Sequence, residues 1–308
     1  MPTLEYRTTA HNRKIQLNLG LGTVQFGLDY GISNPGGKTP PLEVAAILRM
    51  ALASGIDLLD TAPAYGDSEQ VLGTSLAAIA KPRIVTKTPQ FNTSTVKAAD
   101  ARRLTEAFAI SLKNLRVPSV HGLLVHRVED LFLPEGHRLF DAMLELRARK
   151  LVQKIGASVY SGSQIERALE RFDFDLIQLP MNVLDQRLAT GDILPALKLR
   201  GIEVHARSAF LQGVLLQTPS ALPQRFNPIK ALLTTYHDWL AGNGLSPAQG
   251  ALAFMRRQAH VDCTIIGVAT ANQLSEILAA WQHPIPTEMD FRVFACADAH
   301  YIDPRLWT

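Results

Sequence analysis

The stretch LLDTAPAYGDSEQVLG, residues 58–73, joins the end of a buried strand to the start of a helix. The apolar run that ends at Leu59 predicts a short strand, and the amphipathic pattern after Ser68 predicts a helix. Asp60 and Tyr65 lie between them. In a barrel of alternating strands and helices, this edge is where catalytic residues collect. Taken alone, the stretch is equally compatible with a structural role, in which Asp60 is a cap and Tyr65 is an aromatic residue of a turn. The rest of the chain has to decide between the catalytic and the structural role.

The same alternation of strand and helix recurs along the whole chain. Short apolar segments predict strands at residues 15–22, 56–60, 83–87, 122–126, 154–158, 176–180, 202–206 and 263–267. Apolar residues at helical spacing predict helices at 42–54, from 68 onward, and at 98–115, 137–149, 163–171, 193–200, 247–258 and 272–281. Eight such repeats predict a (β/α)8 TIM barrel of the α/β class that occupies residues 1–308 as a single domain. A long loop at about 209–230 and a tail at 283–308 lie outside the pattern.

Composition narrows the classes of function. The chain has 308 residues, of which 47% are hydrophobic, so it can bury a large core. The net charge of +3 comes from 31 basic and 28 acidic residues without a long run of either sign, which argues against a nucleic-acid or membrane partner. No stretch approaches the roughly 20 apolar residues of a membrane helix. Two cysteines, and Glu5 and Arg7 where a signal peptide would be apolar, predict a cytoplasmic protein.

Polar residues end four of the predicted strands, namely Asp60, Lys87, His126 and Ser158, and Gln178 lies within the sixth, at 176–180. In a closed parallel barrel these positions all lie at one mouth. This convergence is stronger evidence for a site than any single residue. It indicates that the mouth formed by the carboxyl ends of the strands carries the chemistry.

Lys87 ends an apolar strand and needs a carboxylate partner if it is buried, and Asp60 on the adjacent strand is within reach. A buried ammonium beside Tyr65 favours the ionised phenol, so we expect a lowered pKa and a better proton donor or acceptor near neutral pH. A histidine at a strand end is, by itself, more often structural than catalytic. Together with the other three residues on successive strands, His126 is predicted to be catalytic.

These residues occur in motifs that resemble those of the aldo-keto reductase superfamily over nearly the whole chain. The motifs are DTAPAYGDSEQVLG at 60–73, VTK at 85–87, LLVHR at 123–127, GAS at 156–158, IQLPMN at 177–182 and IIGVA at 265–269. The resemblance implies an eightfold barrel and reversible hydride transfer between a nicotinamide and a carbonyl. It further implies that Tyr65 is the general acid, that Lys87 and Asp60 tune it, and that His126 orients the carbonyl oxygen.

The resemblance also implies cofactor-binding residues. Ser158 and Gln178 match positions that hold the nicotinamide carboxamide in the family, although Val159 stands where an Asn is usual. After the seventh strand many relatives have a Tyr that stacks on the nicotinamide, and here that position is Arg207. The full set of expected cofactor residues is Gly22, Thr23, Ser158, Gln178, Arg207, Ser208, Gly267, Thr270, Asn272 and Gln273.

Arg207 has two interpretations of equal weight. Its guanidinium can stack on the cofactor ring or hold an anionic or polyhydroxy substrate. Alternatively, it forms a salt bridge to a carboxylate of a neighbouring loop.

The sequence indicates the choice between NADP(H) and NAD(H) less clearly than it indicates the catalytic residues. Family habit favours NADP(H), and basic residues usually surround its 2'-phosphate after the eighth strand, yet residues 267–273 contain no Lys or Arg. The nearest are Arg256 and Arg257. We therefore expect NADP(H) with only modest preference, held by hydroxyl and backbone donors from Thr270, Asn272 and the helix start, and NAD(H) stays open.

The substrate is expected to be a small carbonyl compound or a sugar, in a pocket lined by loop aromatics. Phe26, Tyr30, Phe210 and the tail through Trp307 are the candidates. Two alternatives to an active reductase are a regulatory protein that binds the cofactor on the same scaffold and a metal-dependent barrel hydrolase. The nine histidines are dispersed without an HxH or HExxH pair, so we predict no metal site.

Overall fold

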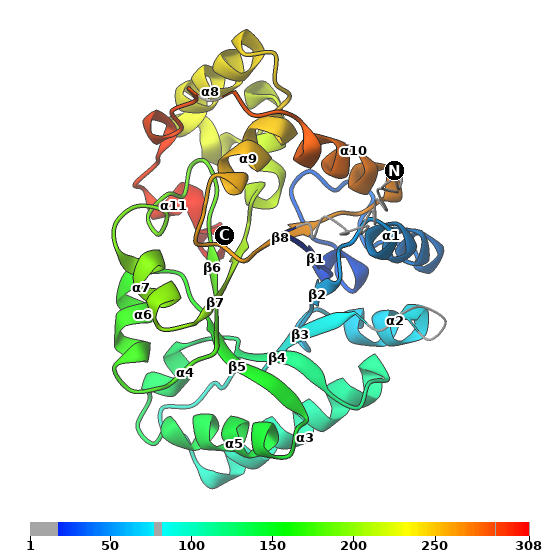
Figure 1. The fold of residues 1–308 in the computed structure, drawn as a ribbon, viewed down its shortest axis with the longest axis vertical. Coiled ribbons are helices and arrows are strands. Elements are labelled where there is room, and N and C mark those ends of the chain that lie inside the picture. Colours follow the sequence, from blue (N-terminus) through cyan, green and yellow to red (C-terminus); the bar gives the residue numbers. More distant parts are fainter. Residues whose placement is uncertain (1–17, 77–81, 287, 308) are drawn as a thin grey trace, which may run out of the picture.

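The computed structural model describes residues 18–76, 82–286 and 288–307. Its eight strands form one closed barrel in sequence order, and each strand runs parallel to its neighbours, as Figure 1 shows. The strands are β1 (Leu19–Gly22), β2 (Leu58–Asp60), β3 (Arg83–Lys87), β4 (Val120–Val125), β5 (Val152–Ser158), β6 (Leu176–Pro180), β7 (Glu203–Arg207) and β8 (Cys263–Gly267). The predicted TIM barrel is therefore confirmed.

Helices surround the barrel (Figure 1). They are α1 (Pro41–Ala53), α2 (Ser68–Ser75), α3 (Ala98–Leu115), α4 (Glu129–Phe132), α5 (His137–Ala148), α6 (Gly162–Leu169), α7 (Ile193–Leu199), α8 (Lys230–Gly242), α9 (Pro247–Arg256), α10 (Ala271–Gln282) and α11 (Ala299–Ile302). Several begin at residues that the sequence marks clearly. In α9, for example, Ser246 accepts a hydrogen bond from the backbone of Gln249 while the Gln249 side chain bonds back, and Pro247 occupies the first helical position.

The predicted elements agree with the observed ones to within two residues at nearly every end. The bounds of β3, α3, β6 and β8 coincide with the prediction, and residues 15–17 of the predicted first strand lie outside the described residues. The predicted loop at 209–230 is wrong in detail because it contains the 3₁₀ helices η3 (Leu211–Leu216), η4 (Pro219–Ala221) and η5 (Gln224–Ile229). Prolines in this segment break the longer apolar periodicity, so only short turns of helix form.

Two further regions carry structure that the sequence reading missed. Helix α8 buries Leu233, Tyr236 and Leu240, which follow helical spacing and were a detectable signal. The C-terminal tail contains η6 (Arg292–Phe294), α11 and η7 (Pro304–Leu306). Within the described residues, no helix is both long and apolar enough to cross a membrane.

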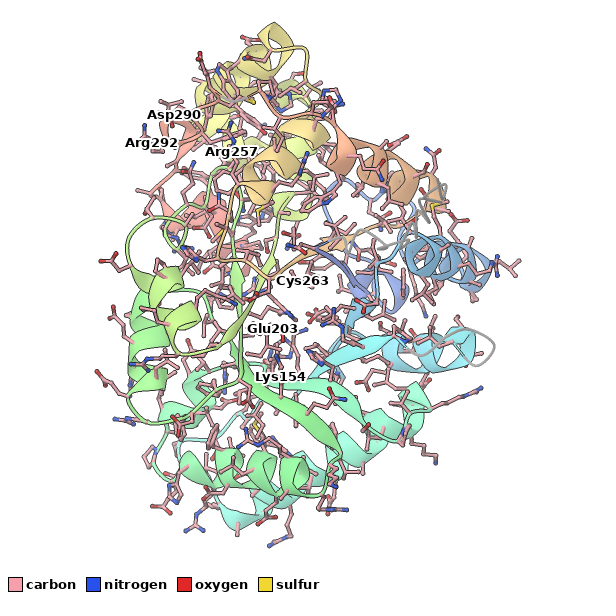
Figure 2. The ribbon with its side chains drawn as sticks, in the orientation of Figure 1. Lys154, Glu203, Arg257, Cys263, Asp290 and Arg292 are labelled. Carbon is pink, nitrogen blue, oxygen red and sulfur yellow. The ribbon has the colours of Figure 1, made fainter. Side chains whose placement is uncertain are left out.

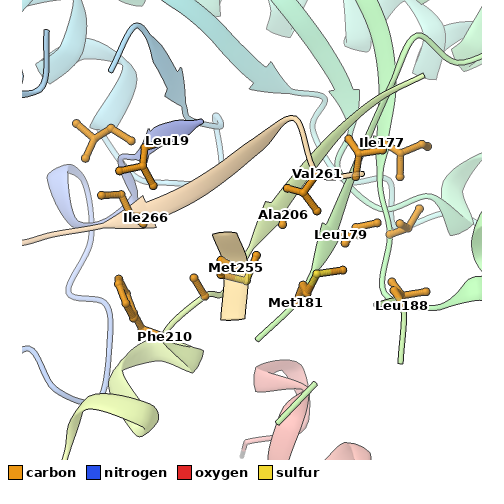
Figure 3. Close-up of a cluster of buried hydrophobic side chains, with 14 of the residues drawn as sticks. Leu19, Ile177, Leu179, Met181, Leu188, Ala206, Phe210, Met255, Val261 and Ile266 are labelled. Carbon is orange, nitrogen blue, oxygen red and sulfur yellow. The ribbon is translucent and has the colours of Figure 1, made fainter. Parts of the chain in front are cut away.

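The core has two layers, which follow from the alternation of side chains along each strand. Inside the barrel, Leu58, Val85, Leu124, Leu176, Cys263 and Ile265 form one buried cluster. Their neighbours on the same strands, such as Leu59 and Ile84, pack outward against the helices. Figure 3 shows this outer layer where Ala206 of β7 and Ile266 of β8 approach Met255 of α9. The apolar barrel interior ends below the strand carboxyl ends, where polar side chains take over.

Candidate active site

A cavity of about 650 Å³ opens at the carboxyl ends of the strands. The loops that follow the strands, together with the tail, complete its wall. The predicted site residues that line it are Gly22, Thr23, Tyr30, Asp60, Tyr65, Lys87, His126, Ser158, Gln178, Arg207, Ser208, Phe210, Gly267 and Gln273. Strand ends that are far apart in sequence therefore meet in one space.

The floor of the cavity contains a buried ion pair. Asp60 ends β2 and Lys87 ends the adjacent β3, and their exposed fractions are 5% and 2%. The Lys87 ammonium donates to both oxygens of the Asp60 carboxylate, at 2.9 and 2.8 Å, and to the carbonyl of Thr61 at 2.9 Å. The carboxylate partner that the sequence predicts for Lys87 is present. Because both charges are paired and hydrogen-bonded, their burial is tolerated.

Tyr65 is held over this pair by a tight turn after β2. Its ring centroid lies 4.8 Å from the Lys87 ammonium. Two glycines allow the turn to pack against the loop after β1: a Cβ at Gly27 would lie 1.8 Å from the Tyr65 carbonyl oxygen, and Gly66 has a φ of +60°. This close backbone approach fixes the position of the phenol.

The structure corrects the expected pKa of Tyr65. Burial raises its pKa, and this effect, together with the negative charge of Asp60, outweighs the lowering by Lys87. The sequence reading counted the ammonium but neither the desolvation nor the carboxylate that neutralises it. The phenol therefore stays protonated at neutral pH, which suits a proton donor. Burial alone would lower the pKa of Lys87, but Asp60 and Tyr65 reverse this and raise it, so the ammonium stays charged.

His126 follows β4 and faces Tyr65 edge to face, with the ring centroids 6.0 Å apart. Burial, and then the positive charge of Lys87, lower the pKa of His126 to about 4. The imidazole is therefore neutral at physiological pH and carries one N–H. Its Nδ1 is buried and has no hydrogen-bond partner among the described residues. A neutral imidazole can donate a hydrogen bond to an oxygen in the cavity while it keeps its proton.

Gln178 provides an open acceptor that fits a nicotinamide. Its side chain is fully buried, and Nε2 donates to an Asp60 carboxylate oxygen at 2.7 Å. The other end, Oε1, has no hydrogen-bond partner in the part of the chain that the structure describes. An unsatisfied buried carbonyl costs free energy unless a ligand donates to it, and the amide NH₂ of a carboxamide is such a donor. Ser158 lies beside it at the end of the paired strand β5.

Thr23 connects the ends of the first two strands. Its hydroxyl donates to the Asp60 carbonyl at 2.9 Å and accepts a hydrogen bond from Ser68 at the same distance. Thr23 and Gly22 thereby hold the cavity wall next to the ion pair. Thr23, which is predicted to bind the cofactor, therefore also connects the end of β1 to β2 and α2.

Two predicted cofactor residues do not reach the cavity. Thr270 caps α10 and accepts a hydrogen bond from the backbone of Gln273, and the Asn272 amide donates to Glu276 at 2.7 Å. Both side chains are used within the helix start, so the expected hydroxyl and amide donors are not on the wall. Gln273 lines the wall, and so does Glu276, which the sequence reading missed.

The nearest arginines in sequence do not supply the missing positive charge. Arg256 donates to the carbonyl of His283 at 2.6 Å, and Arg257 donates to the carbonyls of Pro286 and Met289. Both hold the C-terminal tail. In Figure 2, Arg257 lies toward the periphery of the molecule with Asp290 and Arg292.

The expected substrate wall is partly wrong. Phe26 is 0% exposed and belongs to the hydrophobic core, because the 3₁₀ helix η1 (Val24–Phe26) turns its side chain inward. Tyr30 and Phe210 line the cavity as predicted. Trp307 packs edge to face on Phe226 instead, with the centroids 5.1 Å apart. The tail does reach the cavity, but through Pro304 and Arg305.

Arg207 ends β7 and points its guanidinium over the ring of Tyr160, at 4.1 Å from the centroid. It donates to the carbonyl of Val159 at 3.2 Å. Among the described residues, no carboxylate lies within 4.0 Å of it, so the predicted loop salt bridge is not found. Sequence reasoning missed Tyr160, although its place just after β5 was a usable signal. The tail was among the expected wall segments, but nothing in its sequence pattern singles out Arg305.

An eightfold parallel barrel whose phenol, ammonium, carboxylate and imidazole meet in one cavity is typical of barrel enzymes with acid–base chemistry. The model of the Aldo/keto reductase family matches residues 18–297, and the chain belongs to this family.

Named relatives extend this result. The chain is 26% identical to Protein tas of Escherichia coli (strain K12) over 325 residues, which covers 88% of this chain and 91% of that protein. It is 25% identical to the pyridoxal 4-dehydrogenase of Microbacterium luteolum, with the same coverage, and 29% identical to the D-threo-aldose 1-dehydrogenase of Pseudomonas sp over 62% of this chain and 68% of that protein.

Solved structures share the fold. The holo form of the aldo-keto reductase AKR11C1 from Bacillus halodurans matches with a TM-score of 0.72 at 19% identity, covering 90% of each chain. The glycerol dehydrogenase AKR11B4 from Gluconobacter oxydans matches with a TM-score of 0.67 at 22% identity, covering 88% of each chain. Family and relatives together show that the protein is an enzyme, an oxidoreductase that depends on a pyridine nucleotide.

Proposed function

We propose that the protein catalyses reversible hydride transfer between a nicotinamide and an aldehyde, ketone or sugar, with Tyr65 as the general acid and base. The observation that carries this proposal is a protonated Tyr65 phenol beside a buried Lys87–Asp60 pair and a neutral His126. This arrangement provides a proton donor, a charge that stabilises its conjugate base, and a hydrogen-bond donor for the substrate oxygen.

Each residue has a separate role in carbonyl reduction. His126 donates its N–H to the carbonyl oxygen and orients it toward Tyr65. Tyr65 releases its proton to that oxygen as negative charge develops, and the Lys87 ammonium stabilises the phenolate that is left. Asp60 holds Lys87 in place. The bound nicotinamide supplies the hydride.

We assign the nicotinamide end of the cofactor to the wall made by Gly22, Thr23, Ser158, Gln178 and Ser208. The buried Oε1 of Gln178 supports this assignment because it lacks a donor that a carboxamide would provide. The adenosine end is assigned to the wall after β8, where Gly267 and Gln273 line the cavity.

For cofactor choice we propose little discrimination, with NADH bound at least as well as NADPH. The sequence favoured a modest preference for NADPH, but the structure adds two carboxylates near the start of α10. Glu43 accepts a hydrogen bond from the backbone N–H of Ala271 at 2.5 Å, and Glu276 lines the cavity. A carboxylate that already occupies a helix-start amide repels a 2'-phosphate.

The substrate class that we propose follows from polar residues on the cavity wall. Tyr30, Asn34, Gln212 and Arg207 give it hydrogen-bonding groups. Relatives named for pyridoxal, for D-threo-aldose and for L-galactose support a small, polar carbonyl or sugar substrate. We also propose that the chain forms a single domain, since all eight strands close one barrel, and that it acts in a reducing cytoplasm, which its free, buried Cys263 and Cys296 support.

Replacement of the proposed acid tests this function. A panel of aldehydes, ketones and sugars is assayed with NADH and NADPH, and the best pair is then measured for Tyr65→Phe. We expect turnover to fall roughly 100-fold or more while cofactor affinity, measured by fluorescence titration, stays within a few-fold, because the phenol acts on the substrate oxygen. Wild-type turnover in the Phe variant would refute the role of Tyr65. Tight cofactor binding without turnover of any substrate would instead support a regulatory protein.

A further inference from the structure

Two arginines from distant parts of the chain share one aromatic ring at the cavity wall. Arg207 ends β7 and Arg305 lies in η7 of the tail, and both guanidinium groups lie over the ring of Tyr160, at 4.1 and 3.3 Å from its centroid. All three residues line the cavity. Two cations are thus held as close neighbours at the same place on the wall.

The charges at this place do not balance. Arg305 is held by Asp303, with Nη2 to Oδ2 at 2.6 Å and Nε to Oδ1 at 3.0 Å, and Asp303 itself is buried. Arg207 donates only to neutral groups, the carbonyl of Val159 and the hydroxyl of Ser208, and no carboxylate within the described ranges lies in ion-pair distance of it. Asp303 is therefore the one carboxylate among the described residues that makes an ion pair with either guanidinium, while the charge of Glu129 acts on Arg305 from a longer distance. Such an arrangement favours an additional anion, which would relieve the repulsion between the cations.

Arg207 also acts on the groups that we propose to be catalytic. The positive charge of Arg207 contributes to lowering the pKa of His126 and opposes the rise in the pKa of Tyr65. Arg207, Tyr65 and His126 line the same cavity, so one small molecule can contact Arg207 and the Tyr65–His126 pair together. The loop after β7 contacts the loop after β1, because the Gln212 carbonyl accepts a hydrogen bond from the backbone N–H of Ile32 at 3.1 Å.

We propose that Arg207 and Arg305, fixed on Tyr160, form an anion site that holds a carboxylate or phosphate of the carbonyl substrate. This proposal rests on the proposed function and names the substrate class more narrowly: a short carbonyl compound with an anionic group a few bonds from the carbonyl. Arginine forks bind such planar or tetrahedral anions with two hydrogen bonds. A neutral sugar can accept hydrogen bonds from both arginines but leaves the excess charge uncompensated.

Matched substrate pairs test the proposal. Succinate semialdehyde is compared with butanal, and glyceraldehyde 3-phosphate with glyceraldehyde, so that each pair differs mainly in one anionic group and the two pairs distinguish carboxylate from phosphate. We expect the anionic member of at least one pair to have a kcat/KM roughly 10- to 100-fold higher, the size of one or two charge-assisted hydrogen bonds. Inorganic phosphate should inhibit reduction of the neutral member competitively.

Variants assign the effect to the two arginines. Arg207→Gln and Arg305→Gln should each remove most of the preference, measured as the ratio of kcat/KM within a pair, and weaken phosphate inhibition about tenfold. Arg207→Lys keeps the charge but not the fork, so part of the preference should return. Arg167→Gln is the matched control, because Arg167 also lies over an aromatic ring, 4.2 Å from the Phe132 centroid, but not on the cavity wall.

The outcomes separate this proposal from the proposed function. Equal kcat/KM within both pairs, with turnover of all four compounds, overturns the anion site and leaves the reductase function intact. If Arg207→Gln raises the KM for the cofactor equally with anionic and neutral substrates, Arg207 serves the cofactor and the proposal is wrong. If no compound is turned over, the function fails, and calorimetric titration of inorganic phosphate against wild type and Arg207→Gln still decides whether the anion site exists.

Discussion

The two ends of the barrel each hold a cluster of charged side chains, and they differ in which polar groups stay available to a ligand. At the amino end, the Glu203 carboxylate accepts from His205 at 2.7 Å, lies 3.3 Å from His121 Nε2, pairs with Lys154 and has Arg83 at 3.9 Å. Figure 2 shows Glu203 and Lys154 on neighbouring parts of the barrel. At the carboxyl end, Asp60 and Lys87 form a pair beside the cavity.

The amino-end carboxylate is saturated. Burial raises the pKa of Glu203, but hydrogen bonds from His121, His205 and Lys154 outweigh this and hold its pKa far below the usual range. At the mouth, Gln178 Oε1 and His126 Nδ1 have no partners among the described residues and belong to side chains that line the cavity, and Tyr65 carries a proton that it can give. His205 Nδ1 also has no partner in the described part of the chain, but His205 does not line the cavity. A cluster of charges therefore marks a functional site only where polar groups stay available to a ligand. We therefore expect the amino-end cluster to serve stability and the mouth to serve catalysis.

Lys87→Met should give the largest effect that separates the two ends. The change removes the charge that stabilises the Tyr65 phenolate and leaves Asp60 buried without a cation, so turnover should fall roughly 100-fold or more and stability by about 3–5 kcal/mol. Because Lys87 lowers the pKa of Tyr65, its loss raises that pKa further. The rise of the alcohol oxidation rate with pH should therefore be displaced to higher pH. Steady-state rates between pH 6 and 10 measure this, with circular dichroism to check folding, and an unchanged rate and profile would contradict the pairing.

Glu203→Gln should show the opposite pattern, with lost stability and kept activity. Lys154 and the two histidines would lose their shared carboxylate, so the free energy of unfolding at pH 7 should fall by about 1–3 kcal/mol while kcat stays within about twofold. The folded-state pKa of Glu203 is depressed, so its stabilisation is present above its unfolded pKa of about 4.3 and is lost as the pH falls below it. The difference between wild type and variant in urea unfolding should therefore shrink between about pH 5 and pH 3. A loss of turnover comparable to that of Lys87→Met would mean that the amino end also serves catalysis.

Much of this architecture can be predicted from the sequence. The strand and helix periods gave the barrel, and the strand-end rule gave Asp60, Lys87, His126, Ser158 and Gln178, all of which line the cavity. These succeed because position along a strand determines which end of a barrel a residue occupies.

The predictions that were wrong or missing each have a physical cause. The direction of the Tyr65 pKa shift depends on burial, which a sequence does not give. Phe26 is predicted on the wall as an aromatic residue of a loop, but a short 3₁₀ turn directs its side chain into the core. Arg305 reaches the cavity through a tail whose path depends on contacts far away in the chain.

The smallest effect is expected at Glu276, a carboxylate on the cavity wall. Unlike Glu203, Glu276 has no cation partner within the described residues. Glu276 lines the cavity, where we assign the adenosine end of the cofactor, so its charge should repel a 2'-phosphate. Glu276→Gln should therefore tighten NADPH binding about two- to fivefold at low salt and leave NADH binding unchanged, since exposed charges interact weakly and are screened. Fluorescence titration of both cofactors at low and high salt measures the ratio, with Glu203→Gln as the control. A preference of wild type for NADPH of about a thousandfold that collapses with salt would reveal a strong cationic site, and equal changes for both cofactors would mean that Glu276 lies away from the phosphate.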